Sequence, residues 1–249
     1  MAYQRAYFPV KTISLSQGYG SGSSTHKLSY AIDLAGIQNV YAPFDCKVTK
    51  LYQPIDTKNH ANTVWLTSTK KVLSPNGYYG YLTISITHPS EISKMRIGTI
   101  YKQGEKICTT SKMTGNATGN HVHIEVAKGK DSGWVKKKNG KYSEYVILNK
   151  VKAEDYLFVD EDSTIKKKAY KNKNYNFIKE SDITYVVKNV PSEPLNVRST
   201  TSLNNTKNII GGLTNGEEVI KFYDKGNMSY IYHYEMMGYV ANRYLIKKV

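Results

Sequence analysis

Apolar and polar residues alternate in short runs along much of the chain, and this pattern predicts β-strands. Three runs alternate or are rich in β-branched residues, namely 64–67, 82–87 and 121–126. Because successive side chains of a strand point to opposite faces, such runs indicate a sheet with a buried face. Turn sequences such as Pro75-Asn76-Gly77 and Gly119-Asn120 separate them. No segment shows a capped helical stripe, so we expect an all-β, mainly antiparallel protein.

A change in composition near residue 158 predicts two domains joined by a linker. Residues 160–180 are polar, highly charged and poor in large apolar side chains, as linkers are. A second β-patterned unit begins near Ile183 and continues to the C-terminus. The expected parts are an N-terminal antiparallel-sheet domain at 1–157, a charged linker at 158–182 and a small β-barrel at 183–249.

The charge balance favours an anionic partner. The 249 residues contain 35 Lys and Arg against 20 Asp and Glu, a net charge of +15. Nucleic acid and anionic bacterial wall polymers both attract such a protein. Residues 1–130 alone carry 15 basic and 6 acidic residues, so the excess does not lie in a basic tail. Since no nucleic-acid-binding motif is recognisable either, we expect no nucleic-acid partner.

The sequence gives no indication of a membrane-spanning helix, a signal peptide or a disulfide scaffold. No run approaches the roughly 18 apolar residues of a membrane-spanning helix, so no transmembrane segment is expected. The first ten residues lack a basic stretch followed by an apolar core, so we also expect no secretory signal peptide. Two cysteines, Cys46 and Cys108, exclude a disulfide scaffold and a four-cysteine zinc site. Whether these two pair with each other stays open.

Histidines and a carboxylate in patterned segments suggest a metal site. His121 and His123 stand two apart on a predicted strand, so both imidazoles share one face, and Glu125 follows in the same row. Asp33 lies at the end of an apolar run, where a carboxylate needs a partner, and His26 precedes it. Each feature alone has a plainer interpretation, such as an aspartate bonded to a turn. Together they favour a shared zinc ion, which takes three such ligands in catalytic sites.

Four stretches of the chain, taken in order, resemble one known family. Gln17-Gly-Tyr-Gly, followed by His26 and by Asp33 in Tyr-Ala-Ile-Asp-Leu-Ala, resembles a segment that supplies a first histidine and an aspartate ligand. Val40-Tyr-Ala-Pro-Phe-Asp-Cys-Lys-Val resembles the core strand pair that follows. Thr87-His88-Pro-Ser-Glu-Ile resembles a segment with a catalytic histidine.

The strand Gly119-Asn-His121-Val-His123-Ile-Glu-Val completes the resemblance. It is similar to the Gly-x-His-Leu-His-Phe-Glu-Val strand of the M23 peptidases, the zinc endopeptidases of peptidoglycan related to lysostaphin and LytM. The similarity covers roughly residues 12–127. There are departures: Cys46 replaces the usual glycine, Pro89 replaces leucine after the histidine, and the spacing from His26 to Asp33 is longer. They affect loop geometry and substrate fit more than metal binding.

The resemblance implies a role for each of five residues. His26, Asp33 and His123 would bind Zn²⁺, and His88 and His121 would be the catalytic histidines. In such a site the metal activates water, and a histidine carries the water's proton to the leaving amine. Glu125 would either support a ligand or be a simple surface charge, and the sequence leaves both open.

The C-terminal unit resembles a bacterial SH3 (SH3b) domain. Its opening, Leu195-Asn-Val-Arg-Ser, and its close, Gly238-Tyr-Val-Ala-Asn-Arg-Tyr-Leu, are typical of that family. The usual tryptophan is absent, and Met228-Ser-Tyr230 occupies its region. SH3b domains commonly bind the peptide part of peptidoglycan, so the unit would hold the peptidase on its insoluble substrate. A spacer or a partner-docking barrel is the alternative.

These observations predict a zinc-dependent endopeptidase that hydrolyses stem-peptide or cross-bridge bonds of bacterial peptidoglycan. Anionic wall polymers and phage tail proteins are further candidate partners. Without a signal peptide, the protein would reach the wall through holin pores, as an endolysin, or as part of a phage virion, as a tail-associated lysin. The main alternative is a non-catalytic wall-binding or virion structural protein that reuses the fold, which predicts no tightly bound zinc, or zinc without hydrolysis.

Overall fold

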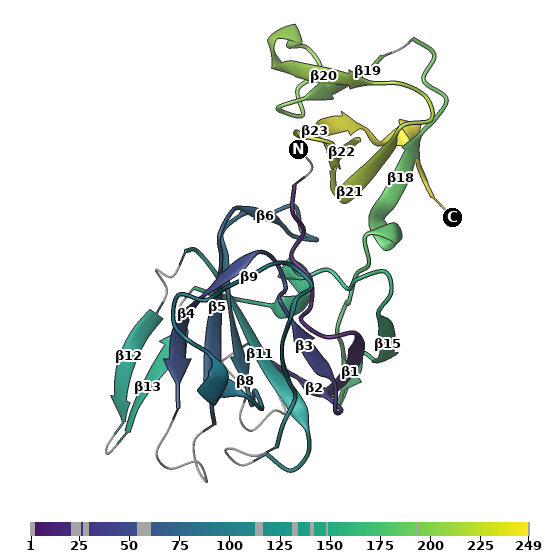
Figure 1. Cartoon of the computed structure of the whole chain (residues 1–249). Helices are drawn as coiled ribbons and strands as arrows, with labels where there is room; N and C mark the ends of the chain where they lie inside the picture. Colours follow the sequence, from purple (N-terminus) through teal and green to yellow (C-terminus); the bar gives the residue numbers. More distant parts are fainter. Residues whose placement is uncertain are drawn as a thin grey trace. The chain divides into compact units, whose positions relative to one another are not determined.

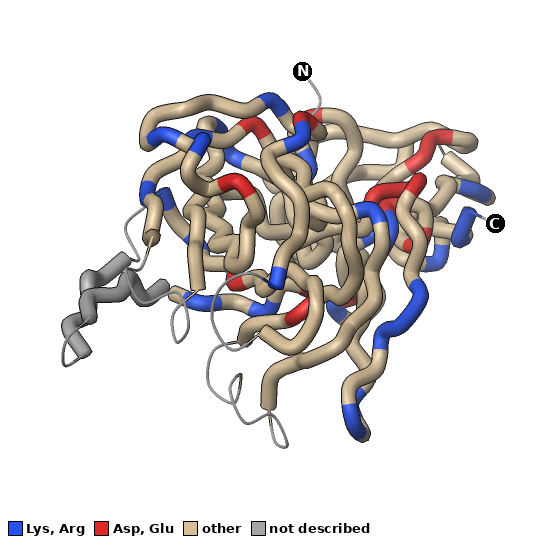
Figure 2. The backbone as a smooth tube through the Cα atoms, turned by 60° about the horizontal axis from the view of Figure 1, so that its bottom comes forward, with Lys and Arg blue, Asp and Glu red and all other residues tan. Residues whose placement is uncertain are grey.

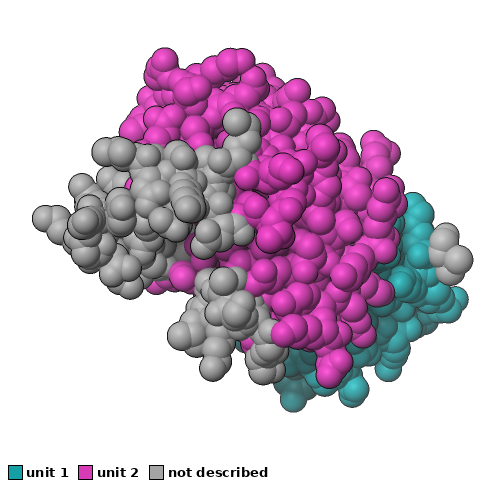
Figure 3. All heavy atoms as spheres, turned by 90° about the horizontal axis from the view of Figure 1, so that it is seen from below, with its two compact units in different colours: residues 1–3, 75–77, 178–249 teal, residues 4–74, 78–177 magenta. Residues whose placement is uncertain are grey.

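Strands form nearly all of the regular secondary structure, and the predicted all-β fold class is confirmed. The structure, a computed structural model, is shown in Figure 1. The chain divides into two compact units, coloured separately in Figure 3. Residues 4–74 and 78–177 (magenta, unit 2 in the key of Figure 3) are called the first unit, and residues 1–3, 75–77 and 178–249 (teal, unit 1 in the key) are called the second unit. The described residues are 3–20, 26, 30–53, 61–112, 117–130, 134–139 and 142–147 (both backbone only), 149–192 and 194–248.

A large sheet forms the centre of the first unit (Figure 1). Its strands are β1 (Thr12–Gln17), β2 (Ile32–Ala35), β4 (Cys46–Tyr52), β5 (Thr63–Ser68), β8 (Leu82–Thr87), β9 (Ile100–Tyr101), β11 (His121–Lys128), β14 (Lys150–Val151) and β15 (Thr164–Lys167). They follow the order β15-β1-β2-β11-β8-β5-β4-β9, and β14 pairs with β11. The three runs predicted from alternation lie in β5, β8 and β11. Neighbouring strands pair antiparallel, except that β15 runs parallel to β1.

Shorter elements surround this sheet. They are β3 (Asn39–Tyr41), β6 (Val72–Leu73), β7 (Tyr79–Gly80), β10 (Lys106–Thr109), β12 (Trp134–Asn139), β13 (Tyr142–Ile147), β16 (Ala169–Tyr170), β17 (Lys173–Asn174), the helix α1 (Ala153–Tyr156) and the 3₁₀ turn η1 (Ile92–Lys94). The small strands pair as β3–β10, β6–β7, β12–β13 and β16–β17. Among the described residues, no helix has the length and apolar character needed to cross a membrane.

The central sheet has an apolar face and a polar face, as the two-residue period of a strand requires. The apolar face forms the hydrophobic core of the first unit. Its fully buried side chains include Val64, Leu66, Ile84, Ile86 and Ile124. On the opposite face the register aligns Asp33, His123, Thr87 and Thr63 in one row across β2, β11, β8 and β5. The sheet therefore brings a carboxylate and a histidine from distant parts of the sequence together.

The charged segment after residue 157 is part of the first unit, and this corrects the predicted linker at 158–182. Residues up to 177 belong to the first unit, and β15 pairs with β1. Four apolar side chains of the segment are buried: Phe158, Val159, Tyr175 and Phe177. The lysines of β15 are exposed on an edge strand. Because lysines are numerous in the segment, its average composition is polar, and the few buried apolar residues do not stand out in it.

Phe177→Ala is expected to destabilise the first unit by about 3–5 kcal/mol, the usual cost of deleting a buried phenylalanine. Phe177 packs edge-on against Phe8, with ring centroids 5.3 Å apart. The free energy of unfolding would be measured on the full chain by urea titration. Lys167→Ala, an exposed change on β15, is the control and should stay within about 0.5 kcal/mol of the parent. Equal stability of the two variants would mean that the segment is a linker after all.

The second unit is a separate antiparallel sheet with its own core. Its strands are β18 (Thr184–Val187), β19 (Leu195–Arg198), β20 (Ile209–Leu213), β21 (Glu218–Lys225), β22 (Met228–His233), β23 (Met236–Ala241) and β24 (Leu245–Lys247), with 3₁₀ turns η2 (Ser181–Ile183), η3 (Thr206–Asn208) and η4 (Asn242–Tyr244). The strand order is β20-β19-β23-β22-β21-β18-β24. Leu195 and Val197 of the predicted opening motif point into the core, together with Ile231 and Val240. The predicted second β unit is therefore present.

Candidate metal centre

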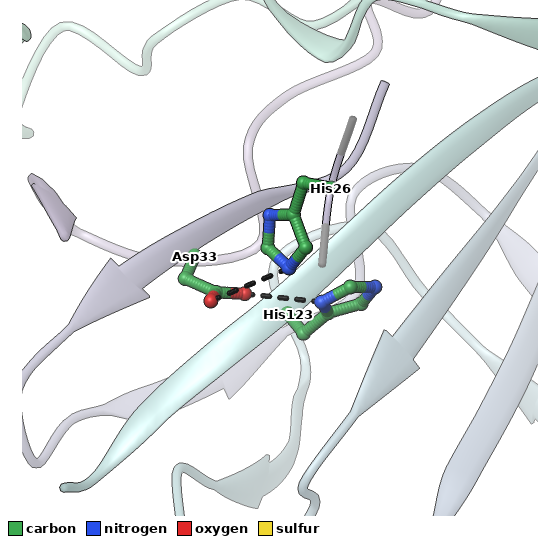
Figure 4. Close-up of side chains that lie close together, drawn as sticks. All are labelled: His26, Asp33 and His123. Carbon is green, nitrogen blue, oxygen red and sulfur yellow. Dashed lines mark hydrogen bonds and ion pairs between the residues drawn. The ribbon is translucent and has the colours of Figure 1, made fainter. Parts of the chain in front are cut away.

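Three side chains meet on the polar face of the central sheet (Figure 4). Asp33 of β2 and His123 of β11 are directly opposite each other in the register. Asp33 Oδ1 lies 3.0 Å from His123 Nδ1, and Asp33 Oδ2 lies 3.5 Å from His26 Nε2. The three potential ligand atoms all lie within 4.8 Å of one another. The structure thus brings together the three residues predicted as metal ligands.

The donor set fits a zinc ion. Ligand atoms about 2.0–2.1 Å from a tetrahedral zinc lie roughly 3.3 Å from each other, close to the separations of Asp33 from both histidines. Two imidazole nitrogens and one carboxylate oxygen are also a ligand set that catalytic zinc uses. His26 and Asp33 are buried, whereas the side chain of His123 stays 21% exposed. The cluster therefore keeps access to solvent, which a substrate site requires.

His26 reaches the cluster because β1 and β2 form a hairpin-like pair. The register places Gln17 at the end of β1 opposite Asp33, so the connection between the strands begins and ends beside the carboxylate. The ring of His26 then packs edge-on against the ring of His123, with centroids 4.7 Å apart. Packing between these rings holds the first histidine over the strand that carries the second.

Burial and mutual charge set the protonation of the cluster. Burial lowers the pKa of His26 to about 4, and the neighbouring His123 adds to this shift. Burial alone would raise the pKa of Asp33, but the hydrogen bond and charge of His123 outweigh it and lower that pKa. The same interaction raises the pKa of His123 against the effect of its burial. A neutral His26 and an ionised Asp33 are the forms that bind a metal ion.

The two histidines predicted for catalysis lie beside the cluster. His121 Nε2 is 3.9 Å from Asp33 Oδ1, and the rings of His121 and His88 have centroids 4.4 Å apart. His121 Nδ1 lies 2.9 Å from the carbonyl oxygen of Gly119. Because a carbonyl can only accept, Nδ1 carries the proton and the lone pair of neutral His121 sits on Nε2. That nitrogen is the one on the side of the metal ligands.

The backbone of His88 is unusual. His88 directly follows β8 and has a φ of +69°, a left-handed conformation that a non-glycine residue adopts at a cost. The next residue, Pro89, leaves the central sheet and bridges to Thr110, while Ser111 bridges to His121. The strained residue thus lies where the chain turns away from β8, and its ring is directed to His121.

Other residues considered from the sequence lie outside the cluster. Glu125 shares the row of His121 and His123, and Lys150 Nζ of β14 lies 3.6 Å from its Oε1. Cys46 and Cys108 are free, buried thiols, and burial raises the pKa of each to about 12. They are therefore inert apolar side chains of the core rather than metal ligands.

Sequence reasoning missed a group of residues that pack around Tyr19. Tyr19, Glu154 and Tyr175 are all buried there and interact with one another. Aromatic residues spaced through an otherwise charged segment, at 170, 175 and 177, were the available signal. The high lysine content of that segment obscured it.

Comparison with known proteins finds relatives by sequence, and one of them is a phage protein. No family model matches the chain. The chain is 36% identical over 138 residues to Morphogenesis protein 1 of Bacillus phage B103. The alignment covers 54% of this chain and 35% of the relative, so the chain spans about a third of the length of the relative it matches.

Solved structures that match this chain in a comparison of structures include several peptidases. Lysostaphin from Staphylococcus simulans, an antimicrobial peptidase, is 14% identical with a TM-score of 0.38, over 97% of this chain and 92% of that chain. The catalytic domain of the prophage-encoded M23 protein EnpA from Enterococcus faecalis, in a mutant form, is 18% identical with a TM-score of 0.37, over 53% and 91%. A zinc-containing peptidase from Vibrio cholerae is 19% identical with a TM-score of 0.36, over 51% and 36%.

Proposed function

We propose that the protein is a zinc-dependent endopeptidase that hydrolyses peptide bonds in bacterial peptidoglycan. The observation that carries the proposal is the convergence of His26, Asp33 and His123 within 4.8 Å, with the rings of His121 and His88 beside them. Metal ligands next to a pair of non-ligand histidines are the arrangement that metal-assisted amide hydrolysis needs. The resemblance of the four sequence stretches to M23 peptidases supports the substrate class.

The protein's own residues have distinct tasks in this reaction. His26, Asp33 and His123 would hold the zinc ion. When bound, that ion would polarise the scissile carbonyl and lower the pKa of a water molecule, so that the water can attack the carbonyl carbon. His121, with its proton fixed on Nδ1 by the Gly119 carbonyl, accepts a proton at Nε2 and later donates it to the leaving amine. His88 lies against His121 and can donate a hydrogen bond to the charge that develops on the carbonyl oxygen.

A place in a phage particle is the delivery route that the relative supports. The similarity to a phage morphogenesis protein favours a tail-associated lysin over an endolysin released through holin pores. The second unit, which resembles an SH3b domain in its opening and closing motifs, would bind the wall. Lys and Arg occur along many segments of the backbone (Figure 2), so anionic wall polymers would add an attraction that weakens with salt.

Purified cell walls from several Gram-positive species, including a Bacillus, test the proposal. We expect new peptide amino termini by mass spectrometry, lost with a zinc chelator and restored by added Zn²⁺. The position of those termini names the scissile bond.

Two other results would contradict the proposal. New reducing sugar ends would show glycosidase chemistry instead of peptide hydrolysis. Walls that bind the protein but gain no new ends, with zinc present, would indicate a non-catalytic wall-binding or virion structural protein.

A further inference from the structure

Tyr19 and Tyr30 stand on either side of His26 in the sequence, and residues from the C-terminal part of the first unit contact Tyr19, which in turn packs on Tyr30. We propose that Glu154 and Tyr175 are positioning residues that hold Tyr19 and Tyr30, the described residues on either side of His26, and thereby set the affinity of the site for Zn²⁺. The proposal rests on the proposed metal centre but not on its hydrolytic activity. Tyr19, Tyr30, Glu154, Lys173 and Tyr175 together are called the tyrosine clamp here.

The first of these residues, Tyr19, is held directly. The Tyr19 hydroxyl donates a hydrogen bond to Glu154 Oε1, and the Tyr175 hydroxyl donates one to the Tyr19 carbonyl oxygen at 2.8 Å. The rings of Tyr19 and Tyr175 also pack edge to face, with centroids 5.2 Å apart. Side chain and backbone of Tyr19 are therefore bound at the same time, which restricts both its position and its direction.

The second residue, Tyr30, is held through Tyr19. Its ring packs edge to face on the ring of Tyr19, with centroids 5.3 Å apart. Tyr30 has a φ of +54°, a left-handed backbone that a bulky residue adopts only when its surroundings impose it. Asp33 follows three positions later, in β2. Tyr19 and Tyr30 thus hold each other, with His26 between them in the sequence and a metal ligand directly beyond.

Gly18 shows how closely Tyr175 approaches the chain next to Tyr19. A Cβ atom added at Gly18 would lie 2.1 Å from the Tyr175 hydroxyl oxygen and 2.4 Å from the ring carbon that bears it. A side chain at position 18 would push Tyr175 away from the Tyr19 carbonyl. The glycine is required here by close approach, because its backbone is not in the left-handed region.

Burying the carboxyl group of Glu154 costs desolvation energy, which an apolar side chain at the same position would not cost. Glu154 is 5% exposed, and its Oε2 atom is buried without a hydrogen-bond partner in the described part of the chain. Lys173 Nζ lies 3.7 Å from the centre of the Tyr19 ring and 4.6 Å from that of Tyr175, so a positive charge covers the two rings next to the carboxyl group. Burial raises the pKa of Glu154.

The part of the clamp formed by Glu154, Lys173 and Tyr175 lies in α1, β17 and the residue after it, far in the sequence from the metal ligands. It therefore acts on the metal only through the positions of Tyr19 and Tyr30. A clamp that merely stabilises the fold would change the unfolding temperature and leave the zinc affinity of the folded protein unaltered. Zinc affinity and local hydrogen exchange distinguish the two cases.

The test uses full-length Glu154→Ala, Glu154→Gln, Tyr175→Phe and Gly18→Ala proteins. Zn²⁺ alone is the probe, and its affinity is measured by competition with a chromophoric chelator at a temperature where every variant is folded. Hydrogen–deuterium exchange is measured on the metal-free proteins, in peptides that contain Tyr19 and Tyr30. The control is Tyr156→Phe, two residues from Glu154, which removes a hydroxyl that makes no hydrogen bond within the described part of the chain.

We expect Glu154→Ala and Gly18→Ala to weaken zinc binding by roughly 10-fold, as the loss of residues that support a metal ligand does. Tyr175→Phe should act in the same direction, and exchange at Tyr19 and Tyr30 should accelerate in all three. Glu154→Gln keeps an acceptor for the Tyr19 hydroxyl and should restore most of the affinity. Tyr156→Phe should match the parent.

Unchanged zinc affinity and unchanged exchange in Glu154→Ala and Gly18→Ala would overturn the proposal, whatever their unfolding temperatures. A parent protein that binds zinc tightly without cleaving walls would sink the proposed function and leave the clamp supported by its own readouts. A parent that binds no zinc would overturn the claim about zinc affinity, and exchange in the metal-free proteins would then decide only whether Tyr19 and Tyr30 are held.

Discussion

Asp33→Asn is expected to weaken zinc binding more than 100-fold, beyond the roughly 10–100-fold loss caused by removing a supporting residue, and to abolish wall hydrolysis. Asp33 is the anionic member of the ligand set, and both ligand histidines approach its carboxylate, at 3.0 and 3.5 Å. An amide of the same shape removes the negative charge and places an N–H donor toward one histidine. Because a bound metal contributes several kcal/mol to the transition state, its loss should reduce hydrolysis by roughly 10³-fold or more.

Zinc content after dialysis, measured by mass spectrometry of the metal, and release of new amino termini from walls are the two measurements. Asp45→Asn is the matched control. Asp45 is also an aspartate of the first unit, in an ion pair with Lys70 at 3.2 Å, and hydrogen bonds and Lys70 outweigh its desolvation to lower its pKa to about 2. We expect this variant to keep its zinc. One equivalent of tightly held zinc in Asp33→Asn would remove Asp33 from the ligand set.

His121→Ala is expected to slow wall hydrolysis by about 10²–10⁴-fold while zinc affinity stays within a few-fold of the parent. That range is the usual contribution of a general acid–base group. His121 Nε2 stands 3.9 Å from Asp33 Oδ1, farther than either ligand histidine stands from that carboxylate, and its Nδ1 faces the Gly119 carbonyl, which holds the ring in one orientation. We therefore propose that this side chain moves protons and does not hold the metal.

His233→Ala is the control for this variant. His233 Nδ1 likewise lies 2.9 Å from a backbone carbonyl, that of Glu218, but in the second unit. The His233→Ala variant should hydrolyse released wall peptides at the rate of the parent protein. The combination of slow hydrolysis and intact zinc in His121→Ala is the decisive result. Loss of zinc would make His121 a ligand, and parental hydrolysis would exclude it from proton transfer.

Much of the local structure could be predicted because it depends on neighbouring residues. Alternation or β-branched residues in three runs predicted β5, β8 and β11, since the side-chain period of a strand is set by its backbone. His121 and His123 were placed on one face for the same reason. The prediction of a linker failed for residues 158–177. A few buried aromatic side chains decide the packing of this segment, whereas its average composition is dominated by lysines.

The sequence by itself determined which chemistry the chain can carry: an all-β framework, imidazole and carboxylate groups suited to zinc, and a second β unit. Only the tertiary structure decided that they meet. Asp33 and His123 lie 90 positions apart and become neighbours because β2 pairs with β11. His88 joins them because β8 lies on the other side of β11. Strand order and the clamp from Glu154 and Tyr175 come from long-range hydrogen bonds and packing, which leave no periodic trace in the sequence.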